Sequence, residues 1–145
     1  MAKLEYSAVI NRPVEEVFDF MNNIENEKLY RTDLLELEQT SEGPVGVGTT
    51  TREVTQFLGR KIETTAEVTE YVPNKVVASK STSGPIPFKF RTSFESVEGG
   101  TKVSMEFEGE VGGFFKMAES LVMKMGMKQI EKDINTLKEM LEGDG

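Results

Sequence analysis

The chain has 145 residues, of which 37% are hydrophobic and 29% charged, as in an ordinary globular domain with one core. Its net charge of −8 lacks the basic footprint that phosphate backbones require, so we expect no nucleic-acid partner. The chain contains no Cys and no His, which excludes disulfides and thiolate metal sites and removes the commonest general base at neutral pH.

The beginning of the chain predicts one strand and two short helices. Residues 3–11 roughly alternate apolar and polar side chains, as in a strand. Pro13, followed by Glu15 and Glu16, suits the first turn of a helix, because Pro needs no N–H there and acidic residues favour the positive end of the helix dipole. A second short helix or turn is expected through residues 24–31.

From residue 33 onward the apolar period changes to two, which predicts strands. Glycine, proline and asparagine residues separate most of these segments, and turns this short join antiparallel neighbours. The six candidate strands are residues 33–40, 48–58, 61–72, 75–82, 87–97 and 101–110.

The turns also predict which residues face each other across the strands. We place the closing turns at Gly59-Arg60, Pro73-Asn74 and Gly99-Gly100. The first turn pairs Phe57 with Ile62, Thr55 with Thr64, Glu53 with Ala66, Thr51 with Val68 and Arg52 with Glu67. The second pairs Glu67 with Lys80, Ala66 with Ser81 and Val68 with Ser79. The third pairs Phe94 with Met105, Thr92 with Phe107 and Arg91 with Glu108.

The end of the chain predicts one long helix. Gly112 and Gly113 end the last strand, and no Pro interrupts the residues from there to Glu142. The second half has one apolar stripe, formed by Met127, Ile130, Ile134, Leu137 and Leu141. The first half is apolar around more than half of its circumference. A helix of thirty residues is about 45 Å long, close to the diagonal of a six-stranded sheet. We therefore expect it to cross the inner face obliquely, with its first half over the middle.

This order of elements resembles the helix-grip fold of the START-like superfamily, and in particular the polyketide cyclase/dehydrase and lipid-transport group (SRPBCC). The resemblance is carried by residues 10–26 (INRPVEEVFDFMNNIEN), 43–50 (GPVGVGTT), 68–77 (VTEYVPNKVV) and 98–108 (EGGTKVSMEFE), and by the final helix. It implies an α+β fold in which about seven antiparallel strands curve around the terminal helix, as a single START-like domain over residues 1–145. It also implies a cavity for small hydrophobic molecules.

Two walls of such a cavity can be named from the predicted inner face. An apolar wall would combine aromatic and Met side chains of the strands with the helix, although an ordinary core has the same composition. A second wall would consist of Thr and Ser hydroxyls, at positions where a dry core would prefer Val and Ile. These hydroxyls either face a cavity or form hydrogen bonds with nearby backbone. The candidate ligand-binding residues are Thr51, Glu53, Thr55, Phe57, Thr64, Ser79, Ser81, Phe88, Phe90, Thr92, Met105, Phe107, Met117, Leu121 and Met125.

Glu53 is the one charged residue on that inner face. It is a candidate for contact with a ligand or, in an enzyme, for proton transfer. Two other interpretations fit: a register error of one residue would turn it to solvent, and a lysine at the helix start, such as Lys116, would form a salt bridge with it. Tyr6, Tyr30 and Tyr71 are further candidate hydroxyls, and we expect no metal and no cofactor.

Three functions follow from these features. The favoured one is binding or transport of a small hydrophobic or amphipathic molecule, without catalysis. The second is an enzyme of the cyclase/dehydratase kind that uses Glu53 or a Tyr. The third is a protein-interaction module that exposes Phe114, Phe115 and Val122. We expect a monomer or weak homodimer. We also expect a cytoplasmic location, because the sequence shows no export signal, and no membrane span.

Overall fold

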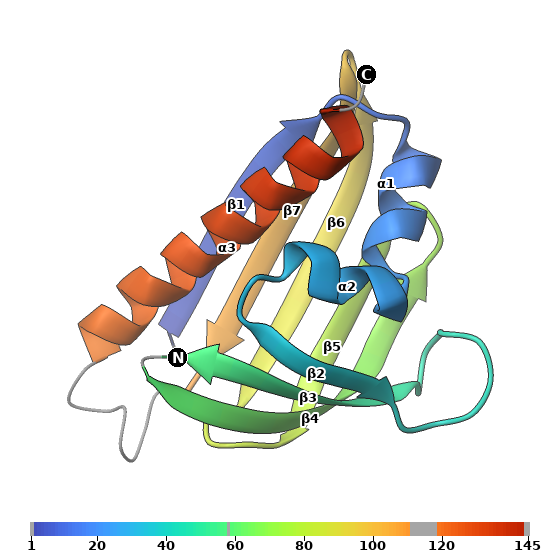
Figure 1. Cartoon of the computed structure of the whole chain (residues 1–145). Helices are drawn as coiled ribbons and strands as arrows, with labels where there is room; N and C mark the ends of the chain where they lie inside the picture. Colours follow the sequence, from blue (N-terminus) through green and yellow to red (C-terminus); the bar gives the residue numbers. More distant parts are fainter. Residues whose placement is uncertain (1, 58, 111–118, 144–145) are drawn as a thin grey trace.

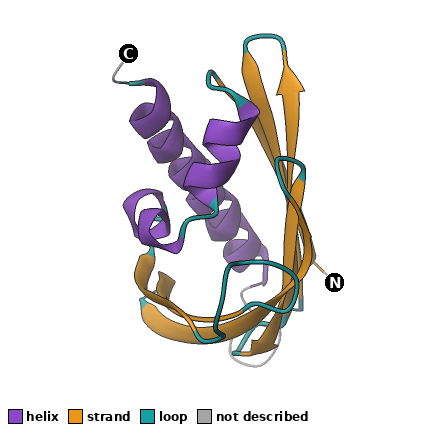
Figure 2. Ribbon diagram, turned by 90° about the vertical axis from the view of Figure 1, so that its right-hand side faces the viewer, coloured by secondary structure: helices purple, strands orange, loops and turns teal. Residues whose placement is uncertain are grey.

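A computed structural model describes residues 2–57, 59–110 and 119–143. These residues form one antiparallel seven-stranded sheet in the order β1-β7-β6-β5-β4-β3-β2, so that β1 and β2 are its edges (Figure 1). Figure 2 shows that the sheet curls and that the three helices lie on its concave side. The elements are β1 (Ala2–Ile10), α1 (Val14–Met21), α2 (Ile24–Tyr30), β2 (Leu34–Gln39), β3 (Thr50–Phe57), β4 (Arg60–Val72), β5 (Val76–Ser83), β6 (Phe88–Val97), β7 (Gly100–Gly109) and α3 (Glu119–Glu142).

The observed strands agree with the predicted ones to within two residues at either end. The arrangement is the α+β fold that the resemblance implies, with a curled sheet and a terminal helix in its concavity. The predicted start of the terminal helix, including Gly112, Gly113 and the Phe114-Phe115 pair, lies outside the described residues.

Both predicted short helices are present, although Pro13, expected in the first turn of α1, precedes that turn. Pro13 is the N-cap of α1 in an extended conformation, and Glu15 and Glu16 lie in the first turn. Asn23 caps α2, because its side-chain oxygen accepts a hydrogen bond from Glu25 N at 2.9 Å. Arg31, the C-cap of α2, therefore lies at a fixed position beside the start of β2.

Two of the three predicted hairpin registers are wrong by two residues. Phe57 pairs with Arg60 and Val97 pairs with Gly100, so the first chain reversal lies between Phe57 and Arg60 and the last lies at Glu98-Gly99. The observed pairs are Thr55 with Ile62, Glu53 with Thr64, Thr51 with Ala66 and Arg52 with Thr65, and then Phe94 with Val103, Thr92 with Met105 and Arg91 with Glu106. A shift of two residues keeps every side chain on its predicted face.

The position of glycine explains these two shifts. Gly59 and Gly99 have φ values of +77° and +89°, which suit glycine as the second residue of a two-residue turn. Gly100 is instead a strand residue, and a Cβ there would collide with the carbonyl oxygen of Ile10 in β1. Glycine thus serves the close approach of β7 to β1 at this position rather than the turn.

The predicted register of the middle hairpin is confirmed. Ala66 pairs with Ser81, Glu67 with Lys80 and Val68 with Ser79. The turn itself contains three residues, with Asn74 at φ +65°, rather than the predicted two. An irregularity in β4 between Val68 and Glu70 restores the predicted register beyond it.

Helix α3 lies along the edge strand β1 and also contacts α2 (Figure 1). The predicted stripe is confirmed at Ile134, Leu137 and Leu141, which are buried in the main core with side chains of α1, β1, β6 and β7. The expectation that the first half of the helix lies over the middle of the sheet is wrong for its described part. There Val122 packs with Ile62 of β4, which the curl of the sheet brings to the helix.

None of the described helices is long and apolar enough to cross a membrane.

Candidate functional site

A cavity of about 400 Å³ lies between the concave face of the sheet and the helices. It is lined by members of both hydrophobic clusters, such as Phe94 and Met21 from the main core and Ile62 and Val122 from the smaller one. Its volume is typical of small-molecule sites.

Most of the residues proposed from the sequence line this cavity. Glu53, Phe57, Phe88, Phe90, Met105 and Phe107 are on its surface, together with the five hydroxyl residues Thr51, Thr55, Thr64, Ser79 and Thr92. They come from β3, β4, β5, β6 and β7, because the inward-facing residues of neighbouring strands share one face of the sheet.

The five hydroxyls have no hydrogen-bond partner among the described residues. They are not sealed from open space either, since Asp33 Oδ1 is the only fully buried side-chain polar atom without a partner in the described part of the chain. A hydroxyl left unpaired in a dry core costs about 1–3 kcal/mol. Here the space beside the hydroxyls can hold polar atoms that pair with them.

An aromatic wall lies beside these hydroxyls on the same face of the sheet, where Ser79 pairs with Phe90. Phe107 of β7 lies 5.8 Å from Phe88 and 6.2 Å from Phe90 between ring centres, both on β6. The first pair is stacked and the second is edge-to-face, which are favourable arrangements for aromatic rings. The rings therefore support one another as a preformed apolar surface.

Three of the sequence-proposed residues lie away from the cavity. Ser81 accepts a hydrogen bond from Phe88 N at 2.9 Å, so its hydroxyl stabilises the β5–β6 connection. Leu121 and Met125 are 50% and 36% exposed, because the helix turns Val122, Met123 and Gly126 to the cavity instead. Met117 lies outside the described residues.

Glu53 lines the cavity but is paired with an arginine rather than a lysine. Arg31 donates from Nη2 to Glu53 Oε2 at 2.9 Å and from Nη1 to Glu53 Oε1 at 3.3 Å. Arg31 Nη1 also contacts Glu27 Oε1 at 3.2 Å, one helical turn earlier. The expected alternative partner, Lys116, lies outside the described residues.

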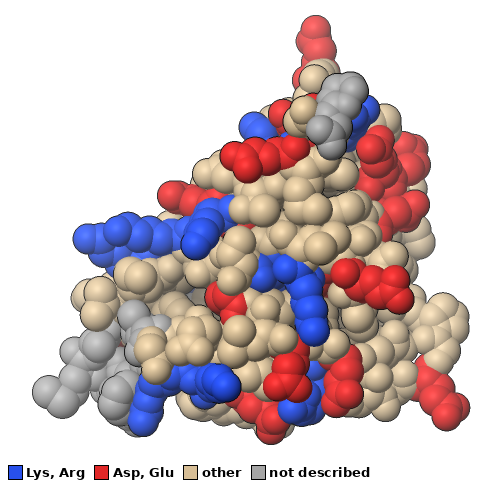
Figure 3. Space-filling model, in the orientation of Figure 1, with Lys and Arg blue, Asp and Glu red and all other residues tan. Residues whose placement is uncertain are grey.

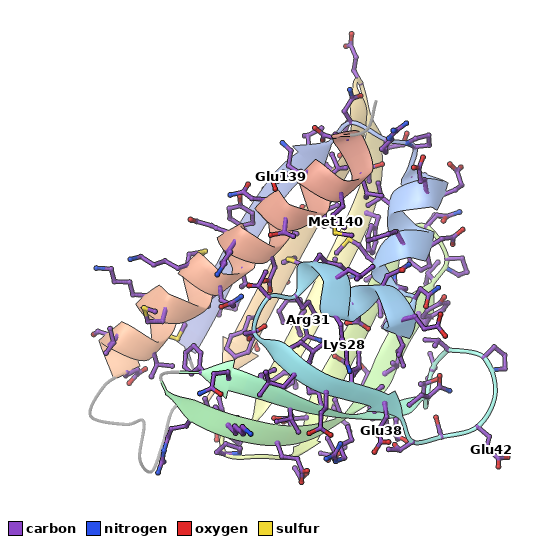
Figure 4. All side chains as sticks on the ribbon, in the orientation of Figure 1. Lys28, Arg31, Glu38, Glu42, Glu139 and Met140 are labelled. Carbon is purple, nitrogen blue, oxygen red and sulfur yellow. The ribbon has the colours of Figure 1, made fainter. Side chains whose placement is uncertain are left out.

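We call the group Glu27, Arg31, Asp33, Glu53 and Asp133 the polar corner of the cavity. It forms where the end of α2, the start of β2, the middle of β3 and α3 meet. Figure 4 shows Arg31 between α2 and β2. Asp133 ties α3 to this corner, because its Oδ1 accepts hydrogen bonds from Thr32 N at 3.0 Å and Gln129 Nε2 at 2.8 Å.

Burial and crowding perturb the titration of the polar corner. Burial raises the pKa of Glu27, Asp33 and Asp133 above the ordinary range, and the nearby Arg31 opposes this rise. Burial alone would lower the pKa of Arg31, but the Glu53 and Glu27 carboxylates outweigh it and raise that pKa. Arg31 is therefore held as a cation, and the carboxylates around it share its charge.

Sequence reasoning missed four residues of the polar corner: Glu27, Arg31, Asp33 and Asp133. The Glu27–Arg31 spacing of four residues on a short helix is a visible signal of a pair, but it does not predict that the pair faces a cavity. The contact with Asp133 joins residues about a hundred positions apart, which no local pattern shows.

The sequence matches the family model described as polyketide cyclase/dehydrase and lipid transport over residues 1–142. The chain belongs to this family. No curated protein matches the sequence.

Solved structures show the same fold as this polyketide cyclase/dehydrase and lipid-transport family member. TTHA0849 from Thermus thermophilus is similar with a TM-score of 0.86 at 21% identity, over 99% of both chains. A START superfamily protein from Mycobacterium smegmatis has a TM-score of 0.81 at 13% identity, again over 99% of both chains. DR_A0006 from Deinococcus radiodurans has a TM-score of 0.72 at 17% identity, with the same coverage. At these identities the likeness establishes the helix-grip fold.

Proposed function

We propose that the protein binds a small hydrophobic or amphipathic molecule in the cavity between the sheet and the helices. One observation carries this proposal: an aromatic wall and a group of unpaired hydroxyls line the same cavity of about 400 Å³. An apolar body would replace water against the rings, and polar atoms of the ligand would pair with the hydroxyls. Membership of a family described as polyketide cyclase/dehydrase and lipid transport agrees with this use of the cavity.

The enzymatic alternative has less support. Glu53 was its candidate for proton transfer, and both of its carboxylate oxygens are engaged by Arg31. Tyr30 lines the cavity, but its hydroxyl donates to the carbonyl of Met21 at 3.0 Å. Both groups therefore hold the fold in place where an enzyme would need them free to move a proton.

The protein-interaction alternative also has less support. It required Phe114, Phe115 and Val122 to form an exposed apolar patch. Val122 is buried and packs with Ile62, while Phe114 and Phe115 lie outside the described residues.

The proposal is tested by filling the cavity. Ala66 is buried on the inner face of β4 and lines the cavity, whereas Ala78 of β5 alternates to the outer face between the cavity residues Val77 and Ser79. Leucine at either position adds the same volume. We expect Ala66→Leu to weaken binding of the neutral apolar dye N-phenyl-1-naphthylamine about tenfold or more, a difference of about 1.4 kcal/mol. Ala78→Leu should bind the dye like the original protein.

A second measurement looks for the natural ligand. Native mass spectrometry of protein purified from its host should show a bound small molecule, and Ala66→Leu should reduce its occupancy. Equal dye binding by both variants, with no small molecule bound to the original protein, would contradict a role for the cavity in binding.

A further inference from the structure

Most of the N–H and phenol donors around the cavity are engaged with the protein itself. The Tyr30 hydroxyl donates to a carbonyl of α1 at 3.0 Å, and the Gln129 amide donates to Asp133 at 2.8 Å. Both terminal nitrogens of Arg31 donate to carboxylates. Three N–H···O bonds of Arg31 and the donors of Gln129 and Tyr30 are thus engaged with the protein itself. The donors left for a ligand among the described lining residues are the threonine and serine hydroxyls and the remaining N–H groups of Arg31 and Asn22.

One acceptor beside the cavity, by contrast, has no hydrogen-bond partner among the described residues. Asp33 lines the cavity, and its Oδ1 is buried without a hydrogen-bond partner in the described part of the chain. A buried carboxylate oxygen without a donor is unfavourable, more so than a neutral acceptor. Because the carboxylate torsion of Asp is soft, a small rotation would turn this oxygen toward the cavity, where a donor from outside the chain would satisfy it.

The charges around the cavity also favour a ligand with a positively charged donor. The polar corner places four carboxylates around a single guanidinium, and Arg31 is the only Lys or Arg among the described lining residues. Glu67 also borders the cavity, but it alternates with the buried Ala66 and Val68 and so belongs to the outer face of β4. The lysines of α3, visible in Figure 3 as blue atoms along that helix, do not line the cavity. The corner therefore carries excess negative charge.

Resting on the proposed function, we propose that the ligand carries a protonated amine, whose N–H groups bond to Asp33 in the polar corner while its apolar body lies against the aromatic wall. An ammonium group supplies both what Asp33 Oδ1 lacks and the charge that the corner lacks. A fatty acid or a phosphate ester would instead bring an anion to a site whose one cation is already shared by Glu27 and Glu53. The cavity thus selects amphipathic amines against amphipathic acids.

The test compares three probes that share one tail. Isothermal titration calorimetry at about pH 7 measures the affinity for n-decylammonium, 1-decanol and decanoate, because an alkylamine, like Lys, stays protonated up to a pH of about 10. We expect decylammonium to bind about tenfold or more tightly than either other probe. Decanol reports the contribution of the tail without charge.

Two Asp→Asn variants test whether the preference for decylammonium arises in the polar corner. Asp33→Asn keeps the shape of the side chain and removes its charge, and it should lower the affinity for decylammonium about tenfold while leaving decanol unchanged. Asp133→Asn should also lower the affinity for decylammonium. This second variant controls for a local structural change at Asp33. Asp19→Asn makes the same charge change on the exposed face of α1, away from the cavity, and should have little effect.

Each outcome decides the matter. Decanol or decanoate binding as tightly as decylammonium would overturn the amine preference and leave the proposed function standing. An equal loss in Asp19→Asn and Asp33→Asn would also overturn it, because the preference would then reflect the overall charge of −8. Failure of all three probes and of the neutral dye to bind would overturn both proposals.

Discussion

Removal of the Arg31 side chain should destabilise the fold more than removal of any comparable surface arginine. Arg31 lies 2.9 Å from Glu53 and 3.2 Å from Glu27, and the side chains of all three are less than a quarter exposed. One such pair at 4 Å attracts by about 4 kcal/mol at an effective dielectric constant of 20. Arg31→Met forfeits this attraction and leaves the carboxylates of the polar corner with no cation.

The magnitude follows from the degree of burial. Removal of one partner from a fully buried pair costs about 3–5 kcal/mol. Because the three side chains keep about a fifth of their exposure, we expect Arg31→Met to lower the free energy of unfolding by about 2–4 kcal/mol. Urea denaturation followed by circular dichroism measures this loss as a lower midpoint with an unchanged slope.

Arg52 provides a matched control for this prediction. It contacts three carboxylates, those of Glu36, Glu38 and Glu63, on the outer face of the sheet, where solvent screens them. Arg52→Met should therefore cost much less than Arg31→Met. The double variant Arg31→Met/Glu53→Met should be less destabilised than the sum of the single variants. Equal losses for the two arginine variants would refute the view that burial gives the polar corner its energy.

Two further predictions concern Asp33 and the face of α3. Burial raises the pKa of Asp33 above its ordinary value of 3.8, so the native state keeps a proton that the unfolded chain has already lost, and ionisation at neutral pH costs stability. Asp33→Asn should therefore be more stable than the original protein at about pH 7. Its advantage should disappear as the pH falls below 3.8, and chemical denaturation across this range would show the opposite trend if the assignment were wrong. Leu137 is fully buried and Leu121 is half exposed. Leu137→Ala should therefore cost about 2–5 kcal/mol and Leu121→Ala well under 1 kcal/mol, and similar thermal shifts in the two variants would contradict the observed helix face.

The residues that share the inner face of the sheet were predictable because each error in strand register was two residues. Two turns were placed one residue too late, and each such error shifts the pairing by two positions. Side chains alternate with a period of two, so Glu53 and Thr92 stayed on the inner face although their predicted partners were wrong. An error of one position would have turned the whole hydroxyl row to solvent.

The face of α3 was harder to predict near its beginning. Residues 121–127 are mostly apolar, so the pattern does not distinguish Leu121 and Met125 from Val122 and Met123. The structure resolves the ambiguity through packing. A Cβ on Gly126 would lie 3.2 Å from Leu4 Cδ1, so the helix approaches β1 closely there. That contact fixes the rotation of the helix and leaves Leu121 exposed.

Under the proposed function, the polar corner would link the stability of the folded protein to ligand binding. Its buried Asp33 oxygen lacks a donor, and burial raises the pKa of three of its carboxylates, so the folded protein holds charges there at a cost. A ligand that binds only the folded state stabilises it by about 2.7 kcal/mol at a concentration of one hundred times its dissociation constant. An amine that pairs with Asp33 would supply binding energy and would also offset the free-energy cost of the buried charges in the polar corner. Under the proposed function, an amine bound to Asp33 would remove this cost, so the protein should be more stable with the ligand bound than with the cavity empty.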